Sequence, residues 1–164
     1  MSDASRTRTV TWDDPAPHAA AARDRGGLES MLAMVRGEIP PPPIALLLGF
    51  RLVDVTNGSA TFEGTPAEYH YNPIGVVHGG FALTLLDSAL GCAVFSTLPA
   101  GVGYTTTDVQ ARLIRAITKD TGLVRCTART VHVGRSTGIA QGELTDAAGK
   151  LLAIGSTACA IFRP

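Results

Sequence analysis

The chain has 164 residues, enough for one domain, and 14 Lys and Arg balance 14 Asp and Glu, so the formal net charge is zero. A neutral chain without a basic cluster is not typical of a nucleic-acid binder, and 45% hydrophobic residues exclude a disordered chain. The sequence shows neither an apolar run of about 18 residues nor an apolar leader, so we expect a cytoplasmic protein without a membrane span or secretory signal.

In residues 1–48 the sequence predicts only one short helix. Residues 1–25 alternate small and charged side chains without periodicity, which predicts a flexible arm. Residues 26–48 are expected to form a short helix, with apolar side chains from Leu28 to Val35 at helical spacing, and then a proline-rich joint. We expect Leu46–Leu48 to dock this joint onto the core.

Residues 49–164 are expected to form the main domain. An apolar run from Phe50 leads to Asn57-Gly58, a strong hairpin signal, and the segment from Gly79 to about Thr97 reads as one helix, apolar nearly all round. The remaining segments have the alternation and turn signals of antiparallel strands. Those strands are predicted over residues 104–116, 122–133, 136–144 and 150–162. The expected fold class is α+β, with a sheet curled around one buried helix.

One acid stands out in the predicted helix. Between Tyr69 and Thr107 the only formally charged side chain is Asp87. A carboxylate in an apolar wall needs compensation for its burial, so a functional role is favoured over a structural one. The same helix opens on Gly79-Gly80, where unpaired N–H groups and the positive end of the helix dipole can hold an anion or a developing oxyanion.

The spacing of these features predicts how they act together. Gly79 and Asp87 are eight residues apart, roughly 12 Å along a helix. A carbonyl polariser and an attacking acid must both lie about 3 Å from the reacting group, which one helix does not allow. Two antiparallel helices from paired subunits do allow it. The sequence therefore predicts a composite site at a dimer interface, with two equivalent sites per pair.

Residues 49–162 resemble the hotdog-fold thioesterases, in particular the PaaI-like branch that acts in phenylacetate degradation. The resemblance rests on a short signature and on later turns, and it departs from the family where Ala116 stands in place of a common proline. The matching residues are Asn72, Gly75, His78-Gly79-Gly80, Asp87, Gly134-Arg135 and the Asp146-Gly149-Lys150 turn. It implies hydrolysis of acyl-CoA thioesters to a free acid and CoA, by homodimers or dimers of dimers.

Roles follow from the resemblance at matching positions. Asp87 is implied as nucleophile or general base, and the Gly79 N–H as the donor to the thioester oxygen. His78 and Asn72 are implied to shape the site, although a loop-stabilising role for each is at least as well founded. Thr106 is implied to approach the water from the other subunit, against the alternative of an ordinary strand residue.

Substrate contacts are also implied. Gly80 is expected at the substrate, and Arg135 and Ser136 at the phosphates or pantetheine of CoA. Arg112 and Arg115 are further phosphate candidates, and His70 with its flanking tyrosines is a candidate for the acyl entrance. No cofactor is expected beyond the CoA of the substrate, no metal, and no nucleic-acid or membrane partner. The alternatives are a non-catalytic hotdog protein that binds acyl thioesters or serves in assembly, and a hotdog dehydratase or hydratase.

Overall fold

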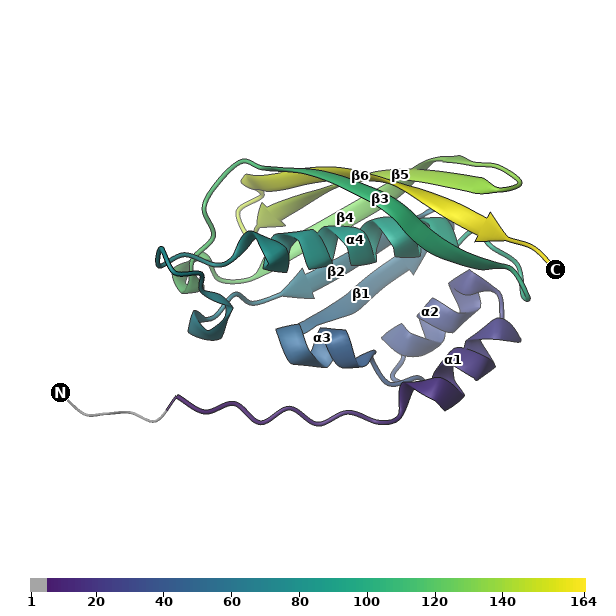
Figure 1. Ribbon diagram of the computed structural model, residues 1–164, viewed down its shortest axis with the longest axis horizontal. Helices are drawn as coiled ribbons and strands as arrows, with labels where there is room; N and C mark the ends of the chain where they lie inside the picture. Colours follow the sequence, from purple (N-terminus) through teal and green to yellow (C-terminus); the bar gives the residue numbers. More distant parts are fainter. Residues whose placement is uncertain (1–5) are drawn as a thin grey trace.

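The structure, a computed structural model, describes residues 6–164 and consists of one antiparallel sheet and one long helix, with three short helices at the side (Figure 1). The expected α+β class is confirmed. The helices are α1 Pro15–Arg23, α2 Gly27–Val35, α3 Pro43–Leu48 and α4 Gly79–Phe95. The strands are β1 Phe50–Thr56, β2 Ser59–Gly64, β3 Gly103–Leu113, β4 Val124–Val133, β5 Thr137–Asp146 and β6 Leu151–Phe162. Two single 3-10 turns lie at Glu68–His70 and Lys119–Thr121.

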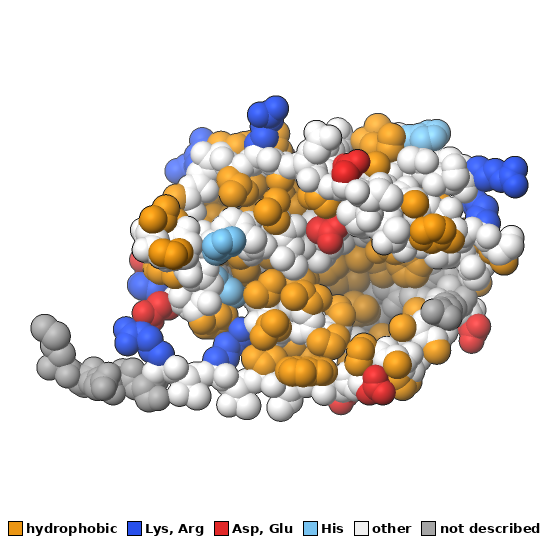
Figure 2. Space-filling model, in the orientation of Figure 1, with side chains coloured by type: hydrophobic (Ala, Val, Ile, Leu, Met, Phe, Trp, Pro, Cys, Tyr) orange, Lys and Arg blue, Asp and Glu red, His pale blue; other side chains and the backbone are white. Residues whose placement is uncertain are grey.

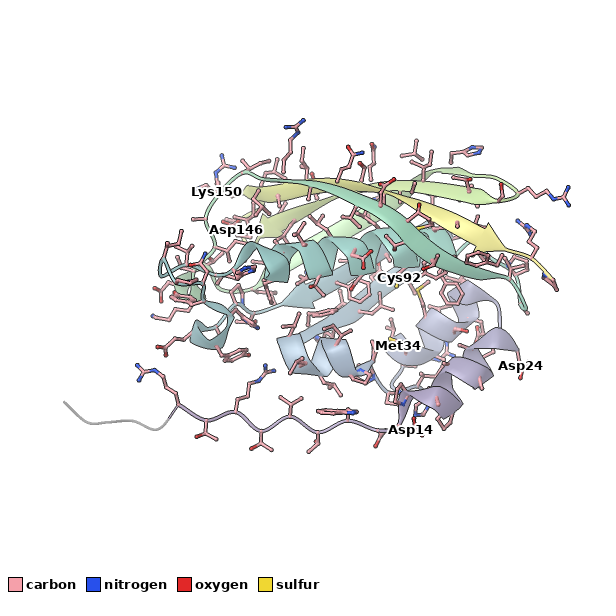
Figure 3. The ribbon with its side chains drawn as sticks, viewed as in Figure 1. Asp14, Asp24, Met34, Cys92, Asp146 and Lys150 are labelled. Atoms are coloured by element: carbon pink, nitrogen blue, oxygen red, sulfur yellow. The ribbon has the colours of Figure 1, made fainter. Side chains whose placement is uncertain are left out.

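The sheet has six strands in the order β1-β2-β4-β5-β6-β3, each antiparallel to its neighbours. The predicted hairpin at Asn57-Gly58 is confirmed: Thr56 pairs with Ser59, and Gly58 takes a φ of 82°, which glycine adopts without strain. The predicted turn between the last two strands is confirmed as well, because Asp146 Oδ1 accepts hydrogen bonds from Ala148 N at 3.0 Å and Lys150 N at 2.8 Å (Figure 3).

Helix α4 lies in the curve of the sheet, as Figure 1 shows. Its sheet-facing side chains are fully buried, among them Leu85, Leu86 and Leu90. Burying a leucine side chain contributes on the order of 1.5–3 kcal/mol, so this face supplies much of the core. Glycines let the layers approach closely: a methyl group on Gly138 would lie 2.5 Å from Val94 Cγ1.

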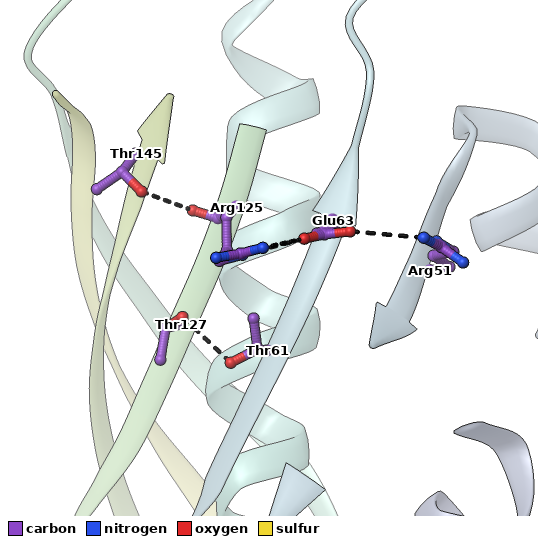
Figure 4. Close-up of polar contacts among 6 residues, drawn as sticks. All are labelled: Arg51, Thr61, Glu63, Arg125, Thr127 and Thr145. Atoms are coloured by element: carbon purple, nitrogen blue, oxygen red, sulfur yellow. Dashed lines mark hydrogen bonds and ion pairs between the residues drawn. The ribbon is translucent and has the colours of Figure 1, made fainter. Parts of the chain in front are cut away.

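A polar row across the outer face fixes the register of the first strands (Figure 4). Glu63 on β2 accepts a hydrogen bond from Arg125 Nε on β4 at 3.0 Å and lies 3.6 Å from Arg51 on β1. In the next row, Thr61 and Thr127 share a hydrogen bond of 3.1 Å. A slip of one residue would turn every core side chain outward and break these pairs.

Part of the predicted flexible arm, residues 1–25, is helical. Residues 1–5 lie outside the described part, but residues 15–23 form helix α1. Pro15 occupies the first helical position, Asp14 Oδ1 accepts a hydrogen bond from Ala16 N at 2.9 Å, and an alanine run follows (Figure 3). Alanine has the highest helix propensity, so local preference forms this helix without an apolar stripe.

Helix α2 matches its prediction, whereas the following joint does not match in full. The chain is extended at Pro42 and then turns into α3 at Pro43. Ala45 is buried and Leu48 packs against the core as predicted, while Leu47 is 49% exposed. The predicted docking of Leu47 is therefore wrong, because the short helix points it outward.

The two edge strands have different surroundings. Helices α2 and α3 pack against β1, whereas within residues 6–164 no other strand pairs with the free edge of β3. A long edge of this kind offers unpaired backbone groups to another chain. None of the described helices is long and apolar enough to cross a membrane.

Candidate active site

The loop that leads into α4 is held by Asn72. Its Oδ1 accepts hydrogen bonds from Ile74 N at 3.1 Å and Val76 N at 3.2 Å, and Gly75 takes a φ of 81°. This side chain therefore forms the turn, which is the alternative considered for it from sequence. It also borders the cavity described below.

His78 caps helix α4. Its Nδ1 accepts a hydrogen bond from Gly80 N at 2.9 Å, and its own backbone N–H donates to His70 O at 2.8 Å. The N–H of Gly80, expected at the substrate, is therefore engaged by its own chain. Among the residues that the structure describes, none accepts a hydrogen bond from the N–H of Gly79, so this donor is available at the positive end of the helix.

A small cavity opens beside Gly79. Its volume is about 220 Å³, and it lies between the loop before α4 and the segment that follows β3. Its wall is mostly apolar, with His78, Asn72 and Arg115 as polar members. The apolar members include Val76, Val77, Ala82, Leu113, Ile114 and Ile117. A methyl group on Gly79 would come within 2.6 Å of Leu113 Cδ1, so this leucine packs directly against the Cα of Gly79.

Asp87 lies two turns further along α4. Thr106 Oγ1 on β3 donates a hydrogen bond of 2.9 Å to Asp87 Oδ1. The expectation that Asp87 is enclosed by apolar side chains is wrong for a single chain, in which its side chain is exposed. The physical reason is that Asp87 lies on the side of α4 toward the edge strand β3, where this chain leaves the helix open.

The Thr106 hydroxyl therefore restrains the carboxylate of its own chain. Its implied approach to the water from the other subunit concerns a second copy and stays a prediction. The pairing of β3 with β6 shifts between Thr106 and Asp108, and this bulge brings the hydroxyl toward α4.

One chain does not bring all the predicted residues together. Asp87 is not among the residues that line the cavity beside Gly79. Arg135 and Ser136 are exposed in the β4–β5 turn, which lies at the end of the molecule away from the start of α4 (Figure 1). There their backbone oxygens accept hydrogen bonds from Arg163 Nε and Ile161 N, both at 2.9 Å.

Two further expectations change. His70, considered for the acyl entrance, is buried and does not line the cavity. Leu113 was not singled out at all, because a bulky apolar side chain at a strand end gives no sequence signal for its place over Gly79. Arg115 does reach the cavity, and it also donates a hydrogen bond to Leu151 O.

The cysteines supply no nucleophile at neutral pH. Burial raises the pKa of Cys92 and of Cys126 to about 12 and raises the pKa of Cys159 as well, which favours the protonated thiols. Within residues 6–164, no three His, Cys, Asp or Glu side chains gather as a metal site requires.

A larger and more open depression, about 920 Å³, crosses the outer face of the sheet. Of the predicted site residues it contains only Arg112, a phosphate candidate, and paired strand backbone forms its floor. Hydrophobic side chains instead gather on the face toward which α4 opens (Figure 2). Leu83, on the open side of that helix, is 41% exposed, and Leu47 on α3 is also exposed.

Known proteins are similar to this chain over the segment that contains Gly79 and Asp87. The sequence profile of the thioesterase superfamily matches residues 74–153. A 1,4-dihydroxy-2-naphthoyl-CoA hydrolase of Listeria monocytogenes is 27% identical over 114 residues, which are 70% of this chain and 91% of that protein. A phenylacetic acid degradation-related protein of Ralstonia eutropha is 31% identical with a TM-score of 0.71, over 79% of this chain and 98% of that one.

The PaaI protein of Escherichia coli shares the fold. Its TM-score is 0.72 over 82% of this chain and 95% of that one, at 20% identity. The similarity at this identity is one of architecture, an antiparallel sheet around a long helix.

Proposed function

Because the chain belongs to the thioesterase superfamily, we propose that it hydrolyses acyl-CoA thioesters to a free acid and CoA, at a site built by two copies of the chain. The observation that carries the proposal is the start of α4, where the Gly79 N–H meets a largely apolar cavity without an acceptor among the described residues. A donor fixed at a helix N-terminus stabilises the oxyanion that forms when a thioester is attacked. The Listeria relative, named as a CoA-thioester hydrolase, supports CoA as the leaving group.

Asp87 is the group that we assign to the attack. Its carboxylate is exposed on the open side of α4 and is restrained by Thr106. As a nucleophile it forms a mixed anhydride while the C–S bond breaks and the CoA thiolate leaves, and water then restores the carboxylate. As a general base it takes a proton from the attacking water, and the thiolate leaves with a proton. Both routes use the same two groups.

The separation of these groups along one helix favours a homodimer. The distance is roughly 12 Å, too long for both to act on one carbonyl. The free edge of β3 and the open side of α4 lie next to each other, so a second copy that pairs edge to edge sets its α4 antiparallel to the first. Each Asp87 then faces the Gly79 N–H of the other copy. A dimer of dimers keeps this arrangement.

A mixing experiment tests the shared site. Asp87→Asn and Gly79→Pro are each expected to lower thiol release from a panel of acyl-CoAs by at least about a hundredfold. In a mixed dimer, one site combines the intact Asp87 of one copy with the intact Gly79 of the other. Random mixing after unfolding and refolding makes half of the dimers mixed, with one intact site in two, so about a quarter of the wild-type activity returns.

Two outcomes contradict the proposal. Mixtures that stay as inactive as the single variants refute the shared site, and a wild-type chain without thioester hydrolysis refutes the activity. Asp54→Asn, a change of the same kind on the distant strand β1, is the matched control and should retain activity. A wild-type chain that binds acyl-CoAs in calorimetry but releases no thiol would be a non-catalytic binding protein.

A further inference from the structure

His70 is a buried titratable group for which the proposed chemistry has no use. It is 7% exposed and lies where the loop before α4, helix α3 and the first turn of α4 meet. Its Nδ1 accepts a hydrogen bond from Ala67 N at 3.0 Å, and its Nε2 lies 3.0 Å from Leu48 O. A carbonyl only accepts and an N–H only donates, so the ring satisfies both partners only as the neutral tautomer with the proton on Nε2.

Contacts of the ring join the separate segments. The His70 ring centroid lies 4.5 Å from that of Phe81 in the first turn of α4 and 4.3 Å from that of Tyr69. The Arg8 guanidinium lies over the Tyr69 ring, 4.1 Å from the ring centroid. Arg8 also donates hydrogen bonds to Leu46 O and Leu47 O. The imidazole is therefore packed from several sides.

The backbone of His70 leads directly to the candidate site. Its carbonyl accepts the hydrogen bond of His78 N at 2.8 Å, and the next residues, Tyr71 and Val77, form an antiparallel bridge. The loop closed by these pairs begins at His70 and ends at the residue that precedes Gly79. A displacement of the His70 backbone would therefore move His78, the residue before Gly79, through this one hydrogen bond.

We propose that His70 is a positioning residue, which holds the start of α4 in its working place as long as its imidazole is neutral. The inference rests on the proposed function, because the place it protects is that of the Gly79 N–H. A proton on Nδ1 would set two donors against each other at Ala67 N and remove that hydrogen bond. The charge would also be buried beside Arg8.

The surroundings favour the neutral form. Burial lowers the pKa of His70 below its ordinary value, the Leu48 carbonyl opposes this shift, and the charge of Arg8 adds to it. Among residues 6–164, the titratable and charged groups around the ring are Arg8 from the N-terminal segment and Glu68 and Tyr69 from its own turn. Helix α3 presents the Leu48 carbonyl, and α4 presents the Phe81 ring.

The sign of the pH effect follows. An unfolded or opened chain binds a proton at His70 near pH 6.5, whereas the closed loop does not, so acid favours the open form. Closure is complete above about pH 6.5 and is lost as the pH falls toward the lowered pKa of the folded chain. We therefore expect kcat to decline on the acid side of about pH 6.5, and amide exchange in residues 67–80 to accelerate there beyond its intrinsic pH dependence.

Two substitutions of His70 separate its hydrogen bonds from its ring contacts. His70→Phe keeps an aromatic ring against Phe81 but leaves Ala67 N and Leu48 O unpaired. His70→Asn keeps an acceptor close to the position of Nδ1. We expect kcat for benzoyl-CoA and hexanoyl-CoA to fall about tenfold or more in His70→Phe, with KM little changed, and to recover in part in His70→Asn. His132→Phe, at an exposed side chain near the end of β4, is the matched control and should be unaffected.

The acid decline must be assigned to the right histidine. In His78→Asn, where a non-titrating cap replaces the imidazole, the decline should persist on a lower kcat, and in His70→Phe it should disappear. A His70→Phe variant with wild-type kcat, or with the same acid decline, overturns the inference. If the wild type hydrolyses neither thioester, the proposed function fails, but amide exchange of residues 67–80 still tests the inference: it should be faster in His70→Phe than in wild type, and equal exchange in both overturns it.

Discussion

The two ends of helix α4 meet very different surroundings. At the C-terminal end, Ser96 Oγ accepts a hydrogen bond from Gly58 N at 2.7 Å and donates to Ala93 O at 2.8 Å. Helix α2 covers the same end, with Gly27 N donating to Leu98 O at 2.9 Å. At the N-terminal end, the Gly79 N–H borders a cavity and meets no acceptor among the described residues.

The C-terminal end of α4 therefore contributes to the stability of the fold, whereas its N-terminal end is available for chemistry. Paired and buried polar groups contribute to the free energy of unfolding but have nothing left to offer a ligand. An unpaired donor forgoes that contribution and stays available. Substitutions at the start of α4 should therefore change activity, and substitutions at its end should change stability.

The largest effect is expected from Gly79→Pro. Proline at the first helical position removes the N–H without disturbing the helix, and His78 already has the ψ of 136° that a residue before proline requires. We expect kcat to fall by about a hundred- to a thousandfold, as for loss of one oxyanion donor, with little change in melting temperature. Gly79→Ala is the control, because it meets Leu113 in the same way but keeps the N–H. Equal activity of the two variants would contradict the role of this donor.

A change at the other end should act on stability alone. In Gly27→Ala the new methyl group would lie 1.9 Å from Phe95 O, so backbone must move. We expect unfolding to become easier by about 2 kcal/mol and the melting temperature to fall by about 4–8 °C, with unchanged activity per folded molecule. In Gly26→Ala the atom nearest to the new methyl group is 3.6 Å away, so this variant should have the melting temperature of the wild type. Equal melting temperatures of the two variants would show that the contact between α2 and the end of α4 adjusts to the methyl group without loss of stability.

The smallest effect is expected from Ser96→Ala. The hydroxyl is buried, and its loss leaves Gly58 N and Ala93 O without this partner. The free energy of unfolding should fall by about 1–2 kcal/mol, measured as a lower urea midpoint with unchanged slope. A variant that loses activity while keeping its urea midpoint would break the distinction between the two ends.

Local patterns were sufficient for much of the fold. The Asn57-Gly58 hairpin, the apolar run of α4 and the strands after it were predictable because each depends on neighbours in sequence. The helix start at His78-Gly79-Gly80 was predictable for the same reason. Helix α1 was not, because an alanine run lacks the apolar periodicity that indicates a packed helix.

The missing parts of the site depend on contacts across the fold. Thr106 reaches Asp87 because β3 returns beside α4, and Leu113 covers Gly79 because the end of that strand lies over the helix start. His70 is tied to Leu48 and Phe81, which belong to separate helices. None of these distances has a counterpart in local sequence. The sparse charge around Asp87 was correctly seen, but a single chain leaves that region open rather than enclosed.

The position of β6 in the sheet has a consequence for synthesis. Strand β6 is an internal strand, placed between β5 and β3, and it pairs with β3 from Gly103↔Phe162 to Leu113↔Ala153. While the ribosome extends the chain at about 5–20 residues per second, β3 lacks this partner until β6 has been synthesised. Helix α4 stays partly uncovered over the same interval, because β6 also packs against it. A ribosome that stops before β6 therefore releases a chain with a gap inside its sheet rather than a shortened edge.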